Sequence, residues 1–161
     1  MFSSAMMTEP TSPYRWNTSA AAEAFDAAAE HIHPYYIAVQ DQVLGQLPFA
    51  ANEPFSLVDL GGGSGRLIER VLENFPNARV LLVDQSEPFL ALAERKLHRF
   101  GERARLVKCG LQDDWTDELT APPQAIVSMS AIHHLDSVEK QTLFDRCFVA
   151  LGGPRPRILL G

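Results

Sequence analysis

The chain has 161 residues, a length that suits one domain and excludes an enzyme with two full catalytic domains. Hydrophobic residues make up 46% and charged residues 21%, which predicts a compact fold and not a disordered chain. The formal net charge of -6 lacks the positive footprint that DNA or an anionic membrane would attract. We therefore expect a small or neutral ligand.

Three features of the sequence bear on the cellular location of the protein. Residues 1–15 mix Ser, Thr, Pro and Met without a basic start before an apolar stretch, so we expect a flexible tail and not a signal peptide. No apolar run approaches the roughly 20 residues that cross a bilayer. Cys109 and Cys147 lie in apolar segments without metal-like spacing, which is typical of buried thiols in a reducing compartment. We expect a soluble, cytoplasmic protein.

Two helices are predicted ahead of the main domain. Residues 18–30 are rich in Ala, and residues 34–47 place apolar side chains near helical spacing. A link that begins at Pro48 and ends at Pro54 follows them. The chain therefore divides into N-terminal helices at residues 16–54 and a main domain at residues 55–161.

Strands and helices alternate through the main domain. Apolar runs that predict strands are separated by segments with helical spacing. Strands that are apolar on both faces, with helices between them, are typical of a doubly wound α/β fold with a mainly parallel sheet. The predicted strands are residues 55–60, 79–84, 104–109, 125–130 and 157–160, and the predicted helices between them are residues 67–75, 86–100 and 137–151.

A glycine-rich turn follows the first predicted strand. Residues 59–65 read DLGGGSG and lead into a helix, at the end of the strand where ligands of such sheets bind. A nicotinamide fingerprint, G-x-G-x-x-G, would need a glycine in place of Arg66. The shorter pattern G-x-G-x-G is satisfied at Gly61, Gly63 and Gly65. This spacing disfavours NAD.

A second ligand-binding feature ends the second predicted strand. Asp84 lies 19 residues beyond Gly65, where an acidic side chain can accept hydrogen bonds from both hydroxyls of a ribose. Its alternative role is at the start of a helix, near Ser86. Together with the glycine turn, Asp84 favours a cofactor that contains a nucleoside.

From about Ser56 to Leu160 these motifs resemble, in order, those of the class I S-adenosylmethionine-dependent methyltransferases. The glycine turn is similar to the family's first motif. The fourth predicted strand continues into His133, His134 and Leu135, as in members that modify small molecules or RNA. The resemblance implies a Rossmann-like core, S-adenosylmethionine as cofactor, and an unidentified small molecule or RNA as methyl acceptor.

The resemblance also implies roles for single residues. Asp59 would orient the ammonium group of the cofactor through water, and Asp84 would bind the ribose. Gly110 stands where the family often has an acid, so Asp113 would meet the adenine, with the Leu111 amide against the ring. The cofactor-binding residues implied in this way are Asp59, Gly61, Gly62, Gly63, Gly65, Asp84, Gln85, Leu111, Asp113 and Met129.

Aromatic residues of the N-terminal helices have two candidate roles. By the same resemblance, Trp16, Tyr35 and Tyr36 belong to a region that covers the cofactor. The alternative is that they pack the helices against the domain. Both roles stay open at this point.

His133 and His134 are the candidates for a catalytic role. Methyl transfer needs alignment above all, and a general base only where the acceptor must lose a proton. The pair would act as that base or line the acceptor pocket; the alternative is packing at the entry to a helix. With His31 and His33 it forms no recognisable ligand set, so no metal site is expected.

The family's sheet continues beyond this chain. It has the strand order 3-2-1-4-5-7-6, whereas this sequence stops at about strand five, so we expect an incomplete domain whose exposed strand-five edge invites a homodimer. Two functions remain open: methyl transfer, and a vestigial domain that binds the cofactor without turnover. An NAD-dependent oxidoreductase is the weaker third.

Overall fold

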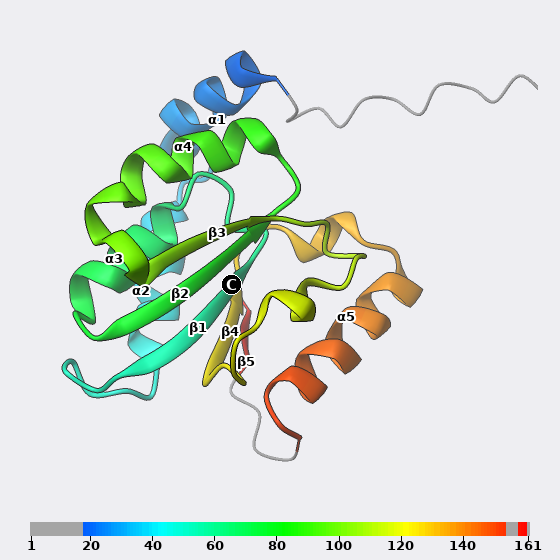
Figure 1. Cartoon of the computed structure of the whole chain (residues 1–161). Coiled ribbons are helices and arrows are strands. Elements are labelled where there is room, and N and C mark those ends of the chain that lie inside the picture. Colours follow the sequence, from blue (N-terminus) through cyan, green and yellow to red (C-terminus); the bar gives the residue numbers. More distant parts are fainter. Residues whose placement is uncertain (1–17, 154–157, 161) are drawn as a thin grey trace, which may run out of the picture.

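A parallel five-stranded sheet forms the centre of the computed structural model, which describes residues 18–153 and 158–160. The strand order is β3-β2-β1-β4-β5, and helices cover both faces (Figure 1). The predicted doubly wound α/β fold is confirmed. The strands are β1 (Phe55–Leu60), β2 (Ala78–Asp84), β3 (Ala104–Lys108), β4 (Ala125–Ser128) and β5 (Ile158–Leu160).

Helices form where the sequence predicts them, and polar side chains cap the N-termini of two of them. The Ser86 side chain accepts a hydrogen bond from the Phe89 N–H, and Asp136 and Glu139 form a capping box. In the described part of the chain, no helix is long and apolar enough to cross a membrane. The helices are α1 (Ser19–Ile32), α2 (Tyr36–Gln46), α3 (Arg66–Asn74), α4 (Glu87–Leu97) and α5 (Ser137–Ala150), with 3-10 turns η1 (His98–Arg103), η2 (Trp115–Glu118) and η3 (Ile132–His134).

Two elements of the main domain end two or more residues earlier than the sequence predicts. The helix expected to reach Phe100 ends at Leu97 and passes into η1, which contains Gly101 in the left-handed region, at φ 56°. The strand expected to reach Ser130 ends at Ser128, because Ser130 itself has a φ of 59°, which a strand cannot adopt.

Apolar side chains are buried on both faces of the sheet, as predicted. On one face Leu57 and Leu82 pack with side chains of α2, α3 and α4. On the other face Val58 and Val83 pack with α5. Since alternate residues of a strand point to opposite faces, Asp59 lies on the side of α3.

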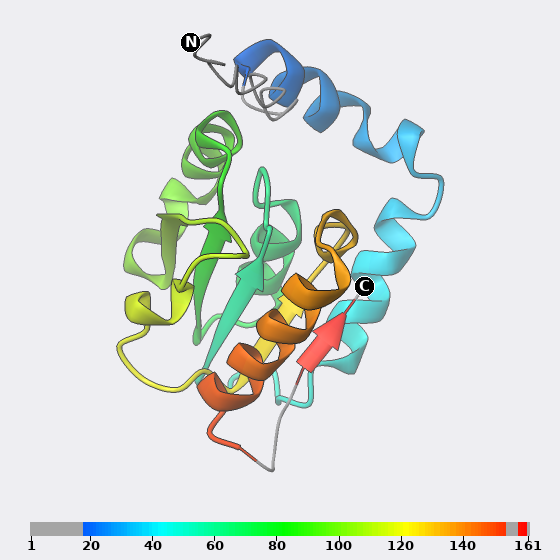
Figure 2. The same cartoon turned by 90° about the vertical axis from the view of Figure 1, so that its right-hand side faces the viewer.

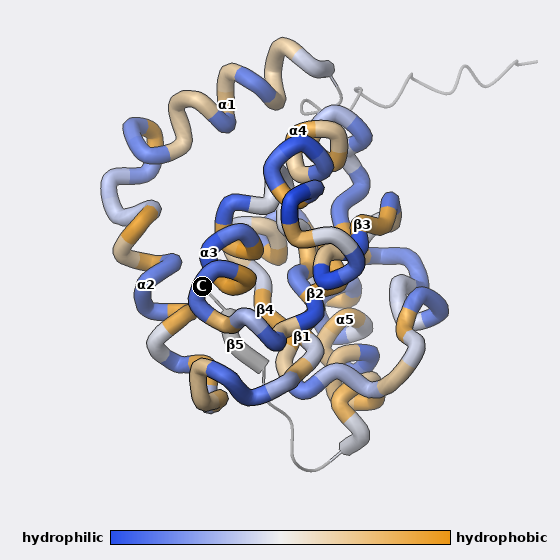
Figure 3. Tube along the Cα trace, turned by 60° about the vertical axis from the view of Figure 1, so that its left-hand side comes forward, coloured by the Kyte–Doolittle hydropathy of each residue, from blue (hydrophilic) through white to orange (hydrophobic). Residues whose placement is uncertain are grey.

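The first two helices lie outside the sheet, along one side of the domain (Figures 2 and 3). α1 contacts α4, while α2 joins the core through Val43 and Leu47. Hydrophobic and hydrophilic residues alternate along both helices, as expected for elements that pack on one side only (Figure 3). The predicted division between residues 16–54 and 55–161 remains a prediction.

β5 is the edge strand on its side of the sheet. Within the described residues it pairs with β4 alone, and it lies beside α2 (Figure 2). A homodimer across this edge stays a prediction. The predicted tail at residues 1–15, Trp16 and residues 154–157 lie outside the described part of the chain.

Candidate functional site

A cavity of about 400 Å³ opens at the carboxyl ends of β1, β2 and β4. Ligands of doubly wound sheets bind at this place, and the volume lies within the roughly 300–1,000 Å³ of small-molecule sites. Most of the residues singled out from the sequence meet in its wall. These are Asp59, Gly61, Gly62, Gly63, Asp84, Gln85, Leu111, Met129, His133 and His134.

The glycine turn presents its backbone to this cavity. Gly61 and Gly63 have φ angles of 72° and 54°, in the region that side chains rarely adopt. A Cβ on Gly61 would lie 2.2 Å from that of Ala131, whereas a Cβ on Gly63 would have nothing within 4 Å. Gly61 therefore permits close packing of the loop after β4, and Gly63 leaves open space in which a ligand can approach.

Two of the predicted residues are absent from the cavity wall. Gly65 is the N-cap of α3, where a Cβ would lie 3.0 Å from a leucine of α4, so this glycine permits helix packing. Asp113 is not among the lining residues, and its carboxylate accepts a hydrogen bond from the Gly110 N–H at 3.3 Å. Leu111 and Gln112 line the cavity on that side instead. An adenine contact from Asp113 therefore remains a prediction.

Asp84 joins the end of β2 to the glycine turn. Its Oδ2 accepts a hydrogen bond from the Gly63 N–H at 2.9 Å, and its Oδ1 accepts one from the Ser86 N–H at 2.8 Å. Burial raises the pKa of this carboxyl, against the lowering effect of the two hydrogen bonds. The contact with Ser86 is the alternative role at a helix start. Each carboxylate oxygen can still accept a further hydrogen bond, so the ribose role stays open.

Asp59 is a buried acid with an unused acceptor. Asp59 is only 1% exposed to solvent, and its Oδ1 has no hydrogen-bond partner within the described residues. Burial, and after it the charge of Asp84, raise the pKa of Asp59 to about 8. A buried polar atom without a partner is unfavourable, and a ligand that donates a hydrogen bond or carries positive charge would satisfy it. The site therefore fits an ammonium group beside the glycine turn.

η3 brings His133 and His134 to the cavity. Their ring centroids are 4.0 Å apart, with the planes inclined by 42°, and both residues are exposed. Exposed imidazoles in a cavity wall can take a proton from a molecule bound inside it. Across residues 18–153 and 158–160, no three His, Cys, Asp or Glu side chains cluster in a way that could hold a metal ion.

α1 and α2 form one side of the cavity, and the sequence analysis named only some of the residues that line it. Phe25, Ile32 and Tyr36 line it, and Phe89 of α4 meets Phe25 edge to face at 5.8 Å. Tyr36 thus lies in the cavity wall, whereas Tyr35 is 76% exposed outside it. No local pattern marks these side chains, because the contact between α1 and the sheet ends is decided by tertiary packing.

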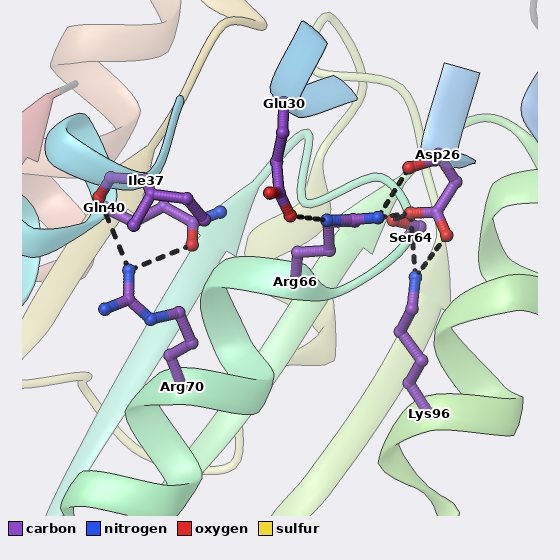
Figure 4. A network of polar contacts seen from close by, with 8 residues as sticks. All are labelled: Asp26, Glu30, Ile37, Gln40, Ser64, Arg66, Arg70 and Lys96. Carbon is purple, nitrogen blue, oxygen red and sulfur yellow. Dashed lines mark hydrogen bonds and ion pairs between the residues drawn. The ribbon is translucent and has the colours of Figure 1, made fainter. Parts of the chain in front are cut away.

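A polar network fastens α1 to the residues that follow the glycines (Figure 4). The Asp26 carboxylate accepts hydrogen bonds from the Ser64 hydroxyl, from Arg66 Nε at 2.9 Å and from Lys96 Nζ at 2.7 Å. Arg66 also pairs with Glu30 at 2.9 Å. Burial alone would raise the pKa of Asp26, but the hydrogen bonds from Lys96, Ser64 and Arg66 outweigh burial and lower it. α1 is thereby held against the glycine turn.

Residues 57–152 match the family model described as methyltransferase domain. The chain belongs to this methyltransferase family. Over 95 residues the domain is 30% identical to ribosomal RNA small subunit methyltransferase H of Prochlorococcus marinus, covering 59% of this chain and 31% of that protein. Over 45 residues it is 47% identical to a 23S rRNA (guanine(748)-N(1))-methyltransferase of Streptomyces fradiae, covering 28% of this chain and 16% of that protein. The chain spans about a third or less of the length of these relatives.

Solved structures share the fold of this methyltransferase domain. A provisionally assigned S-adenosyl-L-methionine-dependent methyltransferase of Methanococcus maripaludis has a TM-score of 0.68 at 16% identity, covering 96% of this chain and 68% of that one. Geranyl diphosphate C-methyltransferase of Streptomyces coelicolor, solved with S-adenosyl-L-homocysteine, has a TM-score of 0.58 at 20% identity, covering 71% and 40%. At these identities the likeness concerns the fold alone. With the family match, it confirms the predicted resemblance.

Proposed function

We propose that the chain is an S-adenosylmethionine-dependent methyltransferase whose acceptor is a small molecule. One juxtaposition carries the proposal: buried Asp59, whose Oδ1 has no hydrogen-bond partner among the described residues, lines the same cavity as Gly63 and Asp84. These groups suit, in turn, an ammonium group, close approach of a ligand, and the hydroxyls of a ribose. S-adenosylmethionine carries an ammonium group and a ribose, and the family match supports it as the cofactor.

When bound, S-adenosylmethionine supplies an electrophilic methyl group on a sulfonium. The acceptor's nucleophilic atom would take this methyl group in an in-line displacement, and the electron pair of the broken carbon–sulfur bond would stay on sulfur. The protein mainly has to hold the reactants in line. Asp59, Asp84 and the glycine turn would hold one of them, and Phe25 and Tyr36 line the same cavity with aromatic surface.

Other residues of the wall receive finer roles in this proposal. Gln85 and Leu111 line the same cavity as Asp84 and would contact the nucleoside base, and Met129 would close the methionine end. An acceptor with a proton on its nucleophilic atom must lose that proton. His133 and His134 are exposed in the same cavity and are the candidates to accept it.

Titration calorimetry with S-adenosylhomocysteine tests the cofactor site without knowledge of the acceptor, and NAD is the comparison ligand. We expect saturable binding of S-adenosylhomocysteine alone. Binding of NAD alone would contradict the proposal and favour an oxidoreductase. The comparison is decisive because both ligands contain adenosine and only one carries an amino-acid ammonium group.

Turnover separates an enzyme from a vestigial binding domain. S-adenosylmethionine labelled in its methyl group is incubated with the protein and a cell extract divided into small molecules and total RNA. Label in the small-molecule fraction supports the proposal, and label in RNA assigns the other acceptor class. Binding without any transfer would favour the non-catalytic alternative.

The two cysteines are relevant to the cellular compartment in which the protein functions. Both are free thiols, and burial raises the pKa of Cys147 to about 11. A thiol that stays protonated is a poor nucleophile and does not form disulfides readily. The proposal of a reducing compartment such as the cytoplasm therefore rests on the two cysteines being unpaired, and not on the pKa of Cys147.

A further inference from the structure

A second cavity, of about 190 Å³, adjoins the first one. His33, Tyr36, Met129 and Ser130 line both, so the two spaces are neighbours that share these four residues in their walls. Met129 and Ser130 directly follow β4, and His33 and Tyr36 come from the junction of α1 and α2. A molecule in the second cavity would therefore lie next to a ligand in the first.

The walls of the second cavity carry no Asp, Glu, Lys or Arg among the described residues. The rings of His33 and Tyr36 lie nearly parallel, inclined by 24° with centroids 6.3 Å apart, and Val39 adds an aliphatic surface. Flat aromatic walls favour a planar guest, because ring faces and edges stack in offset or edge-to-face arrangements. The volume is below the roughly 300 Å³ of a drug-sized site, so it suits one ring system or the end of a larger molecule.

The charges around this cavity disfavour a polyanion. α1 contains three acidic residues and α2 one, and neither helix contains Lys or Arg. The cations that face these helices form ion pairs with the same acids, and they are Arg66, Arg70, Arg95 and Lys96. Figure 4 shows Arg66 and Lys96 both directed at Asp26. RNA binding depends on cations that can neutralise phosphates, and these four are already paired with carboxylates.

Ser130 lines both cavities. Among the described residues it is the one non-glycine residue with a positive φ, at 59°, and strained backbone of this kind concentrates at functional sites. Its hydroxyl is exposed and can pair with one polar atom of a ligand. We propose that the second cavity binds the methyl acceptor as an uncharged, planar, mainly apolar molecule, with a polar group directed at Ser130. This inference rests on the proposed function.

The test uses 2-naphthol, a neutral bicyclic alcohol whose own fluorescence reports binding, with the protein saturated with S-adenosylhomocysteine. Its matched anionic counterpart is 2-naphthyl phosphate. We expect 2-naphthol to bind saturably and at least about tenfold more tightly than the phosphate, since a phosphate would enter a site without cations. Equal binding of the two probes, or displacement of 2-naphthol by a short single-stranded RNA, would overturn the inference.

Variants locate the probe. Val39→Asp places a charge in the wall of the second cavity and should weaken 2-naphthol binding about tenfold or more. Val149→Asp makes the same change on α5, at a residue that is 75% exposed and outside both cavities, and should leave binding unchanged. Tyr35→Ala removes a side chain that is 76% exposed, so it should weaken the probe without unfolding the protein.

The outcomes separate this inference from the proposed function. If S-adenosylhomocysteine itself does not bind, the proposed function fails. If S-adenosylhomocysteine binds and 2-naphthol does not, only the inference about the acceptor is overturned. Unchanged 2-naphthol binding in both Val39→Asp and Tyr35→Ala would likewise overturn it, because the probe would then lie elsewhere.

Discussion

The carboxylate of Asp84 accepts a hydrogen bond from the backbone N–H of Gly63 at 2.9 Å, across 21 positions of the chain. This bond joins the end of β2 to the turn after β1. One acidic side chain therefore fixes the shape of the glycine turn and lines the cavity that the turn helps to form. A substitution at Asp84 has to be measured for both effects.

Asp84→Ala should weaken S-adenosylhomocysteine binding by about 1–3 kcal/mol, because the ribose hydroxyls lose a charged acceptor. It should also lower the unfolding temperature of the ligand-free protein, since the Gly63 and Ser86 N–H groups lose their partner. Titration calorimetry and thermal unfolding measure the two effects. Asp117→Ala, at an exposed acid outside the cavity, is the control. Unchanged affinity in the folded Asp84 variant would refute the ribose role.

Gly63→Val should abolish S-adenosylhomocysteine binding in a protein that still folds. The matched control is Gly101→Val, because Gly101 has a similar φ, 56° against 54°, and open space around its Cβ position, but lies outside the cavity. Both variants should lose unfolding free energy to backbone strain, by about 1–2 kcal/mol or more, and the Gly101 variant should lose at least as much because its ψ of −135° suits Gly alone. Only the Gly63 variant should lose the ligand. Equal binding by the two variants would contradict close approach at Gly63.

The affinity for S-adenosylhomocysteine should rise as the pH increases toward 8. The pKa of Asp59 is raised to about 8, so the free protein holds this proton below that pH and must release it to pair with an ammonium group. The gain is at most about tenfold per pH unit for one proton, and it levels off above the pKa. Calorimetry over this range in wild type and Asp59→Asn measures it. A slope that persists in the Asn variant would assign the proton to another group.

The same shift affects stability with the opposite sign. Because the pKa of Asp59 is higher in the folded than in the unfolded chain, ionisation disfavours the fold. The unfolding free energy of the ligand-free protein should fall, through this group, as pH rises from its ordinary value of 3.8 to about 8. Asp59→Asn should therefore stabilise the ligand-free protein more at alkaline than at acidic pH in denaturant titrations.

Asp26→Ala should release α1 from the glycine turn. We expect faster dissociation of S-adenosylhomocysteine in stopped-flow experiments and a loss of about 1–3 kcal/mol in unfolding free energy, because Lys96 and Arg66 lose their acceptor. The pKa of Asp26 is lowered, so its stabilisation is present above the ordinary value and disappears as pH falls through the lowered one.

An exposed ion pair supplies the control for Asp26. Glu118→Ala breaks the pair with Arg105, whose side chains are 40% and 50% exposed, and should cost about 0–1 kcal/mol. It should leave the dissociation rate unchanged. If Asp26→Ala dissociates no faster than Glu118→Ala, the network does not hold the cavity closed.

Local patterns in the sequence determined the fold of this protein. The alternation of apolar runs with helical segments fixed the strands and their helices, since periodicity and turn chemistry act over a few residues. The same locality explains why the glycine turn and Asp84 could be recognised as candidate ligand contacts. The ends of the elements could not be read in the same way. Ser130, for example, adopts a left-handed backbone that its residue type does not indicate, and β4 ends before it.

Only the tertiary structure decided how α1 is held against the glycine turn and how the pKa of Asp59 is shifted. Asp26 meets Ser64 across 38 positions and Lys96 across 70, and no local pattern pairs residues at such distances. Tertiary structure also leaves Asp113 out of the cavity wall, with its carboxylate bonded to the Gly110 N–H, and places Gly65 against α4. The raised pKa of Asp59 depends on burial and on the nearby charge of Asp84, both of which exist only when the strands are side by side.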